Sequence, residues 1–279
     1  MRVIKVPPER LDAFEAALVD RAGRYVDEPG EHERFRIQMG RWDVVAYDTG
    51  KVTISDEELM PVIVEVLEEV LADEAATVVG SDEAGKGEWL GPLVVGSCAV
   101  PPDERAEFVA EGVMDSKELA RERVVEVADT VERELTHHAV VLVSPPRFNE
   151  LYADVQQEGN SLNDLVAWAH ARALGGVLES LDRAGEAEGV GIVVDESDRV
   201  AAQARTARAF DVERFPMQQR ERAEDEVAMA AASVLAKAAR ERWIDSYEQR
   251  VSGGVRDLSV QKAREHPDRD AFAKTSYLE

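Results

Sequence analysis

The order of apolar and polar positions divides the chain into two regions with different patterns. In residues 1–75, short strand-like runs alternate with two helix-like stretches, which predicts a small α/β unit. The predicted strands are residues 2–6 and the runs HERFRIQ, RWDVVAYD and KVTIS, separated by the turn signals Met39-Gly40 and Thr49-Gly50. The predicted helices are PPERLDAFEAALVDRA, with proline near its start, and a second helix from Asp56 to about Asp73.

From Thr77 onward, apolar strand-like runs alternate with longer helical stretches. The predicted strands are TVVGSDEAG, LVVGSCAV, HHAVVLVS, GVGIVVD and RAFDVERFP, and the predicted helices cover roughly Lys117–Leu135, Asn163–Leu181 and Asp225–Arg250. This alternation predicts a sheet that is at least partly parallel and covered by helices, and nearly continuous apolar strands fit that burial. The short acidic stretch Ala72–Ala75 is the predicted boundary, which gives domains of residues 1–74 and 75–279.

Composition limits the class of protein. The 279 residues contain 44% hydrophobic and 32% charged side chains, with no apolar run long enough to cross a membrane. The N-terminal residues turn polar too early for a secretory signal, so we expect a cytoplasmic protein with no membrane partner. Cys98 is the only cysteine, which excludes an internal disulfide and a cysteine-based zinc site, and the five histidines show no metal-ligand spacing.

The charge balance is strongly acidic, with 57 acidic against 33 basic residues and a formal net charge of −24. Acidic proteins normally repel nucleic acid, because that binding is driven by the neutralisation of phosphates. The acidic residues are spread along the whole chain, however, and do not form a tail. Such a surface suits a cytoplasm with very high salt, where repulsion is screened over about 3 Å at 1 M. We interpret the charge as this kind of adaptation, with a functional acidic face as the alternative.

The segment Val79–Pro92 carries the most chemical information. An apolar strand places the adjacent acids Asp82 and Glu83 directly before the glycine-rich loop Gly85-Lys86-Gly87. Side chains alternate along a strand, so the two carboxylates point the same way only if the strand ends or bends there. An acidic hairpin tip without chemistry is an equally valid interpretation of this segment alone. A phosphate-binding P-loop is disfavoured, because Gly87 replaces the required Ser or Thr and the two acids would lie inside the phosphate cradle.

Two further segments supply carboxylates. Asp195 ends the apolar strand GVGIVVD, and functional crevices of open α/β sheets lie beyond such strand ends. Glu224, Asp225 and Glu226 precede a run of small residues in AEDEVAMAAASVLAKAARER, although acids are also favourable at any helix start. Carboxylates without Cys or His select hard cations such as Mg²⁺ or Mn²⁺. Lys237, Arg240 and Arg242, later in the same helix, are interpreted as surface or phosphate-contact residues.

Together these segments resemble the type II ribonucleases H, that is, ribonucleases HII and HIII. VGSDEAGKGEWLGPLVVGSCAV resembles the first catalytic motif of that family, and DSKEL at Asp115–Leu119 resembles its DSK-L segment. IVVDESD is similar to its third-carboxylate strand, and AMAAASVLAKAARER to its AAS-x-x-AK helix. The motifs occur in the family's order and cover most of Val78–Trp243, so the ordered set is far more specific than any member.

The resemblance implies a ribonuclease H-like mixed sheet flanked by helices, and hydrolysis assisted by two divalent ions, Mg²⁺ or Mn²⁺. The residues that it assigns to catalysis and metal binding are Asp82, Glu83, Asp195 and Glu224, with Asp225 in reserve. The reserve is needed because RAE at Arg222–Glu224 lies one residue closer to the AAS run than the KAE of ribonuclease HIII. The residues that it assigns to substrate binding are Gly85, Lys86, Gly87, Ser116 and Lys117, with Lys86 departing from the family's GRG loop.

Several features resemble ribonuclease HIII more than HII. The N-terminal unit is similar to the TATA-binding-protein-like, substrate-binding domain of HIII. The residues interpreted as gripping the hybrid are Arg34, Arg36, Arg41, Trp42 and Lys51, with a solvated sheet face as the alternative interpretation of the same residues. NDLVAWAHARAL at Asn163–Leu174 resembles an HIII helix, although a structural helix with Trp168 in the core is equally possible. The tyrosine with which HII recognises a lone ribonucleotide is not evident near the AAS run, so stretches of RNA are the expected substrate.

The function implied is endonucleolytic hydrolysis of the RNA strand of RNA/DNA hybrids, leaving 5′-phosphate and 3′-hydroxyl ends, with no obligate protein partner. Three alternatives remain open: a hybrid- or DNA-binding protein of the same fold that no longer cuts, ribonuclease HII-type excision of embedded ribonucleotides, and a nuclease or transposase acting on DNA.

Overall fold

The computed structural model describes residues 1–21, 23–26, 30–72, 76–195, 215, 217–220, 226–251 and 253–278. For residues 194–195 and 217–220 it describes the backbone alone. The predicted boundary at residues 73–75 and most of the predicted strand RAFDVERFP lie outside the described residues.

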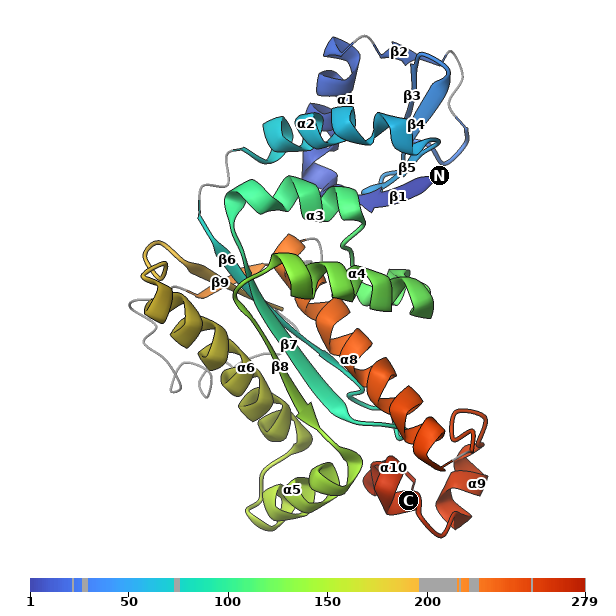
Figure 1. The fold of residues 1–279 in the computed structure, drawn as a ribbon, viewed down its shortest axis with the longest axis vertical. Helices are drawn as coiled ribbons and strands as arrows, with labels where there is room; N and C mark the ends of the chain where they lie inside the picture. The colour runs from blue at the N-terminus through green and yellow to red at the C-terminus, as the bar shows by residue number, and fades with distance from the viewer. Residues whose placement is uncertain are drawn as a thin grey trace.

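The N-terminal unit is an antiparallel sheet covered by two helices (Figure 1). Its strands, in the spatial order β1-β5-β4-β3-β2, are β1 (Arg2–Lys5), β2 (Arg24–Tyr25), β3 (Phe35–Met39), β4 (Trp42–Ala46) and β5 (Lys51–Ile54), and its helices are α1 (Leu11–Asp20) and α2 (Met60–Leu71). Alternate strand residues such as Ile37 and Val52 are fully buried together with Phe14 and Leu67 of the helices, as the period-two pattern predicts. The predicted strands and helices of this unit are therefore confirmed, and the short strand β2 is an addition.

The second unit contains a mixed five-stranded sheet in the order β10-β9-β6-β7-β8. Its strands are β6 (Val78–Ala84), β7 (Leu93–Val100), β8 (His138–Val143), β9 (Gly191–Asp195) and β10 (Met217–Arg220). The hairpin β6-β7 and the pair β7-β8 are antiparallel, whereas β9 runs parallel to both β6 and β10. The prediction of a partly parallel sheet is confirmed, and β6 lies at its centre.

Helices cover this sheet on both faces (Figure 1). The helices of this unit are α3 (Arg105–Glu111), α4 (Arg121–Glu134), α5 (Pro145–Gln157), α6 (Leu162–Ala184), α8 (Val227–Val251), α9 (Val260–Glu265) and α10 (Arg269–Phe272). The long helices α8 and α6 pack on opposite faces of β6 and β7. The predicted helices at α4, α6 and α8 are confirmed, except that α4 begins at Arg121 and the residues before it form a short 3₁₀ helix, Ser116–Glu118.

Two glycines allow α8 to lie directly on the sheet. A Cβ atom on Gly80 would lie 2.4 Å from the carbonyl carbon of Ala228, and one on Gly96 would lie 2.3 Å from the carbonyl oxygen of Ala232. The run of small residues in α8 and the glycines of β6 and β7 thus form two complementary surfaces. This close contact fixes the position of the helix that carries Ser233.

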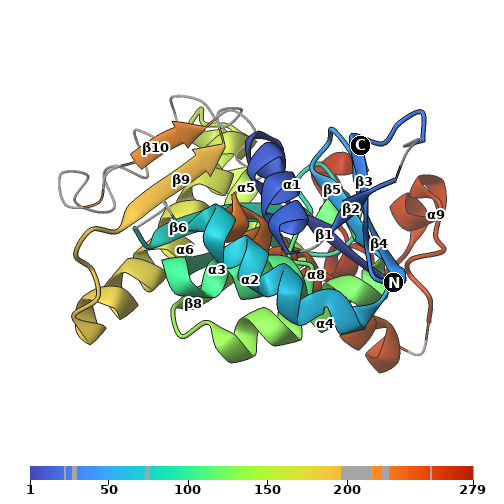
Figure 2. The same ribbon diagram turned by 90° about the horizontal axis from the view of Figure 1, so that it is seen from above.

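The two units share one continuous cluster of buried apolar side chains, which runs from Ile37 and Leu67 through Phe108 to Leu235. Helix α2 lies against α3, and β1 is tied to the second unit by Arg2, whose Nε donates to the Ala110 carbonyl at 3.0 Å. Figure 2 shows β9 and β10 on the side of the molecule opposite to the N-terminal sheet. Among the residues described, no helix combines the length and apolar character needed to cross a membrane.

Candidate active site

The adjacent acids Asp82 and Glu83 point to opposite faces of the central sheet. Strand β6 continues to Ala84 without a bend, and Asp82 and Glu83 pair in register with Gly96 and Val95 of β7. Asp82 therefore faces α8, where it is hydrogen-bonded by Ser233, whereas Glu83 faces α6, where its Oε2 lies 3.1 Å from Nε2 of His170. The strand neither ends nor bends between Asp82 and Glu83, so the two carboxylates do not point the same way. Both residues nevertheless lie near the same end of β6.

The two carboxyl groups have opposite electrostatic environments. Burial and the neighbouring charge of Glu83 raise the pKa of Asp82 to about 6, despite its hydrogen bond with Ser233. Burial alone would also raise the pKa of Glu83, but the hydrogen bond with His170 and the charges of His170 and Lys86 lower it to about 2. Glu83 is thus held ionised, while Asp82 is a buried acid whose charge lacks full compensation.

The glycine loop follows immediately. Gly85 has φ +85°, and a Cβ atom there would lie 2.3 Å from the Pro92 carbonyl oxygen, so the turn requires glycine. Gly87 is exposed with φ +79°, and its N–H donates to the Tyr277 hydroxyl at 3.2 Å. Lys86 lies between them, with its Nζ 3.2 Å from Oε1 of Glu83. No pattern in the sequence indicates that the C-terminal Tyr277 contacts this loop.

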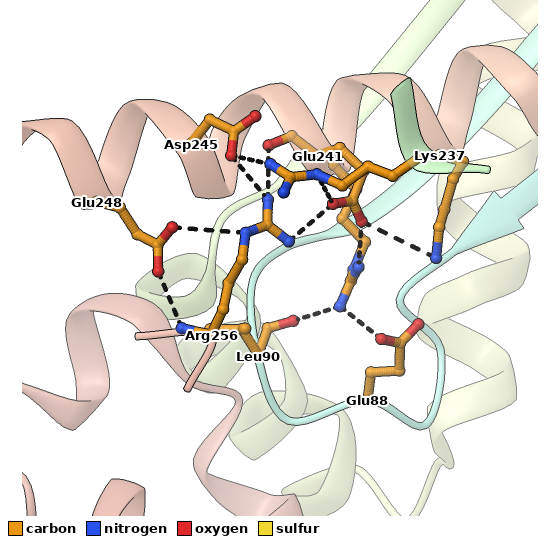
Figure 3. A network of polar contacts seen from close by, with 9 residues as sticks. Glu88, Leu90, Lys237, Glu241, Asp245, Glu248 and Arg256 are labelled. Atoms are coloured by element: carbon orange, nitrogen blue, oxygen red, sulfur yellow. Dashed lines mark hydrogen bonds and ion pairs between the residues drawn. The ribbon is translucent and has the colours of Figure 1, made fainter. Parts of the chain in front are cut away.

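A buried ion-pair network holds the return segment of the loop (Figure 3). Arg240 donates to Oε2 of Glu88 at 2.6 Å, to the Leu90 carbonyl at 2.9 Å and to Oε1 of Glu241 at 2.9 Å. Arg256 in turn donates to Oε2 of Glu241 at 2.8 Å. The side chain of Arg240 is only 5% exposed, so its interpretation as a surface or phosphate-contact residue is wrong.

Of the other two basic residues in that interpretation, Lys237 lies at the edge of the network and Arg242 on the opposite side of α8. Lys237 Nζ is 3.9 Å from Oε1 of Glu241, and Arg242 donates to Glu132 of α4 at 2.7 Å. Their side chains are 33% and 34% exposed, in keeping with a surface position.

The DSKEL segment reaches the site through Ser233. The hydroxyl groups of Ser116 and Ser233 lie 2.8 Å apart, and both side chains are buried. Asp115 caps the short helix by accepting from the Lys117 backbone N–H at 3.0 Å, and the Lys117 side chain is 84% exposed. Ser116 is therefore linked to Asp82 through a single residue, Ser233. The Lys117 side chain extends into solvent beside Ser116.

The third predicted acid lies on the neighbouring strand. Parallel pairing between β6 and β9 ends at Val79 and Ile192, and Asp82 and Asp195 each lie three residues beyond this pair (82 − 79 and 195 − 192). Their backbones therefore reach the same edge of the sheet on adjacent strands. The Asp195 side chain, Glu224 and Asp225 lie outside the described residues. Within the part that is described, no three His, Cys, Asp or Glu side chains form a metal-binding group.

His170 was not predicted as a site residue, although the helix that carries it was predicted. His170 lies in the NDLVAWAHARAL segment of α6, and its ring contacts both Ser81 and Glu83. The alternative with Trp168 in the core is wrong, because that side chain is 44% exposed while Leu165, Val166 and Ala169 are buried. The contact of His170 with Glu83 joins two segments far apart in the chain and could not be read from the sequence.

Known proteins resemble this chain in sequence and in fold. The family model for ribonuclease HII matches residues 79–257, which spans β6 to the segment after α8. The chain belongs to the type II ribonuclease H family. Ribonuclease HIII from Protochlamydia amoebophila is 34% identical over 173 residues, covering 61% of this chain and 52% of that protein. Ribonuclease HIII from Chlamydia trachomatis serovar D is 32% identical over 195 residues, covering 67% of this chain and 61% of that protein.

The type II ribonuclease H fold extends over nearly the whole chain. The structure of Bst-RNase HIII in complex with Mn²⁺ has a TM-score of 0.62 and 22% identity, covering 99% of this chain and 97% of that one. The RNase H3 of Aquifex aeolicus has a TM-score of 0.55 and 19% identity, with coverage of 99% and 100%. The predicted ribonuclease H-like fold class and the greater similarity to ribonuclease HIII are confirmed, and the likeness of the N-terminal unit to a TATA-binding protein stays a prediction. In the two ribonucleases HIII compared by sequence, the matched region spans less than two thirds of the length of each protein.

Proposed function

We propose that the protein is a metal-dependent endoribonuclease that hydrolyses the RNA strand of RNA/DNA hybrids and leaves 5′-phosphate and 3′-hydroxyl ends. The observation that carries this proposal is the placement of Asp82 and Asp195 at the same edge of two adjacent parallel strands. This edge is where open α/β sheets bind their ligands. Membership of the type II ribonuclease H family gives the reaction class, because each of the relatives and solved structures described above is named as a ribonuclease H.

The residues proposed to hold Mg²⁺ or Mn²⁺ are Asp82, Glu83, Asp195 and Glu224, with Asp225 in reserve. Their donors are all carboxylate oxygens, which fit hard divalent cations. The raised pKa of Asp82 fits as well, because a buried carboxylate beside a second one is stabilised when a cation neutralises it. When bound, two such ions supply an activated water and stabilise the leaving 3′-oxygen. A manganese complex of Bst-RNase HIII supports the choice of metal.

Substrate contacts are proposed for the glycine loop and for DSKEL. Gly85 is proposed to contribute by forming the tight turn, and Gly87, which is exposed with open space at its Cβ position, lets the backbone approach a ribose closely. The Gly87 N–H would exchange its bond with Tyr277 for one with a 2′-hydroxyl. Ser116 stays buried beside Ser233 and positions its neighbour Lys117, whose exposed ammonium group can contact a phosphate. Lys86, whose ammonium group lies beside Oε1 of Glu83, is proposed to contact a phosphate of the substrate backbone.

The N-terminal unit, residues 1–74, is proposed to grip the hybrid as a TATA-binding-protein-like domain. Arg41 stacks over the Trp42 ring at 4.9 Å, which provides a flat cationic surface suited to a nucleic-acid backbone. Arg41 also lies 3.7 Å from Glu58, and Arg34 and Arg36 are paired more closely with acids of their own unit, Arg34 with Asp12 at 2.6 Å and Arg36 with Glu33 at 2.5 Å. Hybrid binding through these two residues would therefore have to displace existing partners, and Lys51 lies exposed nearby.

Parallel assays with matched substrates test the proposal. An RNA/DNA hybrid, a duplex DNA carrying one ribonucleotide, duplex DNA and duplex RNA of the same sequence are incubated with Mg²⁺ or Mn²⁺ across a range of KCl. We expect rapid cutting of the hybrid and much slower cutting of the other three. Preferential cutting at the single ribonucleotide would indicate ribonuclease HII-type excision, binding of hybrid without cutting would indicate a binding protein, and cutting of duplex DNA at a comparable rate would contradict the proposal.

A further inference from the structure

We propose that His170 is a positioning residue that holds the carboxylate of Glu83 at the end of β6, through a buried Ser81–His170–Glu83 chain. His170 Nδ1 lies 2.8 Å from the Ser81 hydroxyl, and Nε2 lies 3.1 Å from Oε2 of Glu83. Ser81 is fixed in turn, because its hydroxyl lies 3.1 Å from the Gly96 carbonyl oxygen. This inference rests on the proposed function, in which Glu83 is a metal ligand.

The hydrogen-bond inventory defines which ring nitrogen carries a proton. An ionised carboxylate can only accept, so Nε2 must donate to Glu83. The Ser81 hydroxyl has one proton, which it gives either to the Gly96 carbonyl or to Nδ1 of His170. In the first case Nδ1 donates to Ser81 and in the second it accepts from Ser81, but Nε2–H bonds Glu83 in both. The positioning role therefore holds in either protonation state of the ring.

Glu83 needs this support because of its place on the strand. Its side chain leaves β6 toward α6, on the face of the sheet opposite to Asp82 and Ser233. To act together with Asp82, its carboxylate must stay at the strand end and must not pack under α6. His170 Nε2 binds Oε2, which leaves Oε1 directed toward Lys86 at 3.2 Å. Oε2 of Glu83 is thus held by His170, whereas Oε1 faces Lys86, which a metal ion could replace as its partner.

Burial strengthens the hydrogen bond between His170 and Glu83. The side chains of His170 and Glu83 are 12% and 15% exposed, and Ser81 is buried. Hydrogen bonds to charged groups in such surroundings are stronger than neutral ones in water. Outer partners of this kind orient the groups that hold a metal, and their loss typically lowers metal affinity about 10–100-fold.

The chain contains a matched control for this arrangement. His137 forms a second Ser–His–Glu chain, with Nδ1 2.9 Å from the Ser180 hydroxyl and Nε2 3.0 Å from Oε2 of Glu186. His137 is equally buried, and Ser180 comes from the same helix, α6. However, Glu186 is 63% exposed and follows the end of α6, away from Asp82. Substitution of His137 therefore perturbs packing and hydrogen bonding to a similar degree without touching the site.

Two substitutions separate the roles of the ring nitrogens. A Gln side chain carries its amide nitrogen near the Nε2 position of histidine, whereas an Asn amide reaches only the Nδ1 position. His170→Gln can therefore still donate to Glu83, and His170→Asn can contact Ser81 alone. Mn²⁺ binding to the full-length protein without nucleic acid is measured by electron paramagnetic resonance of the free ion and by calorimetry, and folding is checked by thermal unfolding.

We expect His170→Asn to weaken Mn²⁺ binding about 10–100-fold, His170→Gln to restore most of it, and His137→Asn to leave it unchanged. Equal Mn²⁺ affinity in His170→Asn and wild type would overturn the inference, as would equal losses in the Asn and Gln variants or an equal loss in His137→Asn. Hybrid cleavage by the same proteins separates the two levels. If wild type cuts and His170→Asn keeps the same metal dependence, the inference alone is overturned. If wild type neither binds Mn²⁺ nor cuts, the proposed function is overturned as well.

Discussion

Asp82 and Glu83 show how far single residues can be read from a sequence. Their position at a strand end and the glycine loop after them predict the proposed site, and the position of Asp195 follows from the same rule on a second strand. The hydrogen bonds of Glu83 could not be predicted, because they depend on the rotation of α6 against β6, which side-chain packing sets. The burial of Arg240 was missed for the same reason. It depends on the contact of α8 with Leu90, which lies 150 residues away in the sequence.

Lys274 is a residue whose burial has a measurable consequence. Its side chain is fully buried, and Nζ donates to the Gly91 carbonyl at 2.6 Å, which ties the C-terminal segment to the end of the glycine loop. Burial and the charge of Arg240 lower its pKa to about 7, against a smaller opposing effect of Glu88. Above pH 7 the folded protein therefore releases a proton that the unfolded chain keeps up to its ordinary pKa.

The free energy of unfolding should accordingly rise with pH between 7 and 9, by up to about 1.4 kcal/mol per pH unit from Lys274 alone. Below pH 7 both states are protonated, so this contribution becomes flat. Lys274→Met should remove the rise, as measured by urea unfolding across this pH range, whereas Met in place of the exposed Lys262 should keep it. Parallel curves for Lys274→Met and wild type would contradict the assignment.

At the scale of elements, regular strands and most longer helices were predictable, whereas the shortest helices and α5 were not. β6, β7, β8 and β9 follow from apolar runs, and α6 and α8 from long helical patterns. The helices that the sequence did not predict are α3, α5, α9 and α10, which are short or begin at proline. Tertiary packing stabilises such helices more than their own propensity does.

The contact of α8 with the sheet predicts a severe effect at Gly96. A Cβ atom there would lie 2.3 Å from the Ala232 carbonyl oxygen, a backbone atom that cannot move without displacing the helix. Gly96→Ala should lower the free energy of unfolding by about 1–3 kcal/mol or more and, by shifting the helix that carries Ser233, reduce hybrid cleavage. The measurements are chemical unfolding and single-turnover cleavage.

Gly175→Ala is the matched control, because it lies in α6 with open space around its Cβ position. This variant should gain about 0.5–1 kcal/mol from the higher helix propensity of alanine and should keep its cleavage rate. Equal stability of Gly96→Ala and wild type would show that α8 does not lie on the sheet as closely as described.

At the scale of the whole molecule, the excess of 57 acidic over 33 basic residues dominates. The ion pair of Arg240 and Glu241 is buried and little affected by salt, whereas the acids of the chain outnumber its cations and give a formal net charge of −24. Salt should therefore relieve more repulsion than it removes attraction. The free energy of unfolding is expected to rise from 0.1 to about 2 M KCl.

Thermal and urea unfolding in KCl test this expectation, with wild type compared to a variant in which several exposed acids are replaced by their amides. The variant should depend less on salt. A protein that is stable in dilute buffer and unfolds in molar KCl would show that the acidic composition is not an adaptation to salt, and would favour a functional acidic face.

The central claim, that the acids at the end of β6 cut RNA, is tested most directly by cleavage of a strand-labelled RNA/DNA hybrid with Mg²⁺ or Mn²⁺. Asp82→Asn is compared with wild type and with Asp103→Asn, an exposed acid just beyond the opposite end of the sheet. We expect wild type and Asp103→Asn to cut the RNA strand alone, and Asp82→Asn to lose at least about a hundredfold in rate while folding normally, since it removes a buried charge. Undiminished cutting by Asp82→Asn, or no cutting by folded wild type at any salt concentration, would contradict the account.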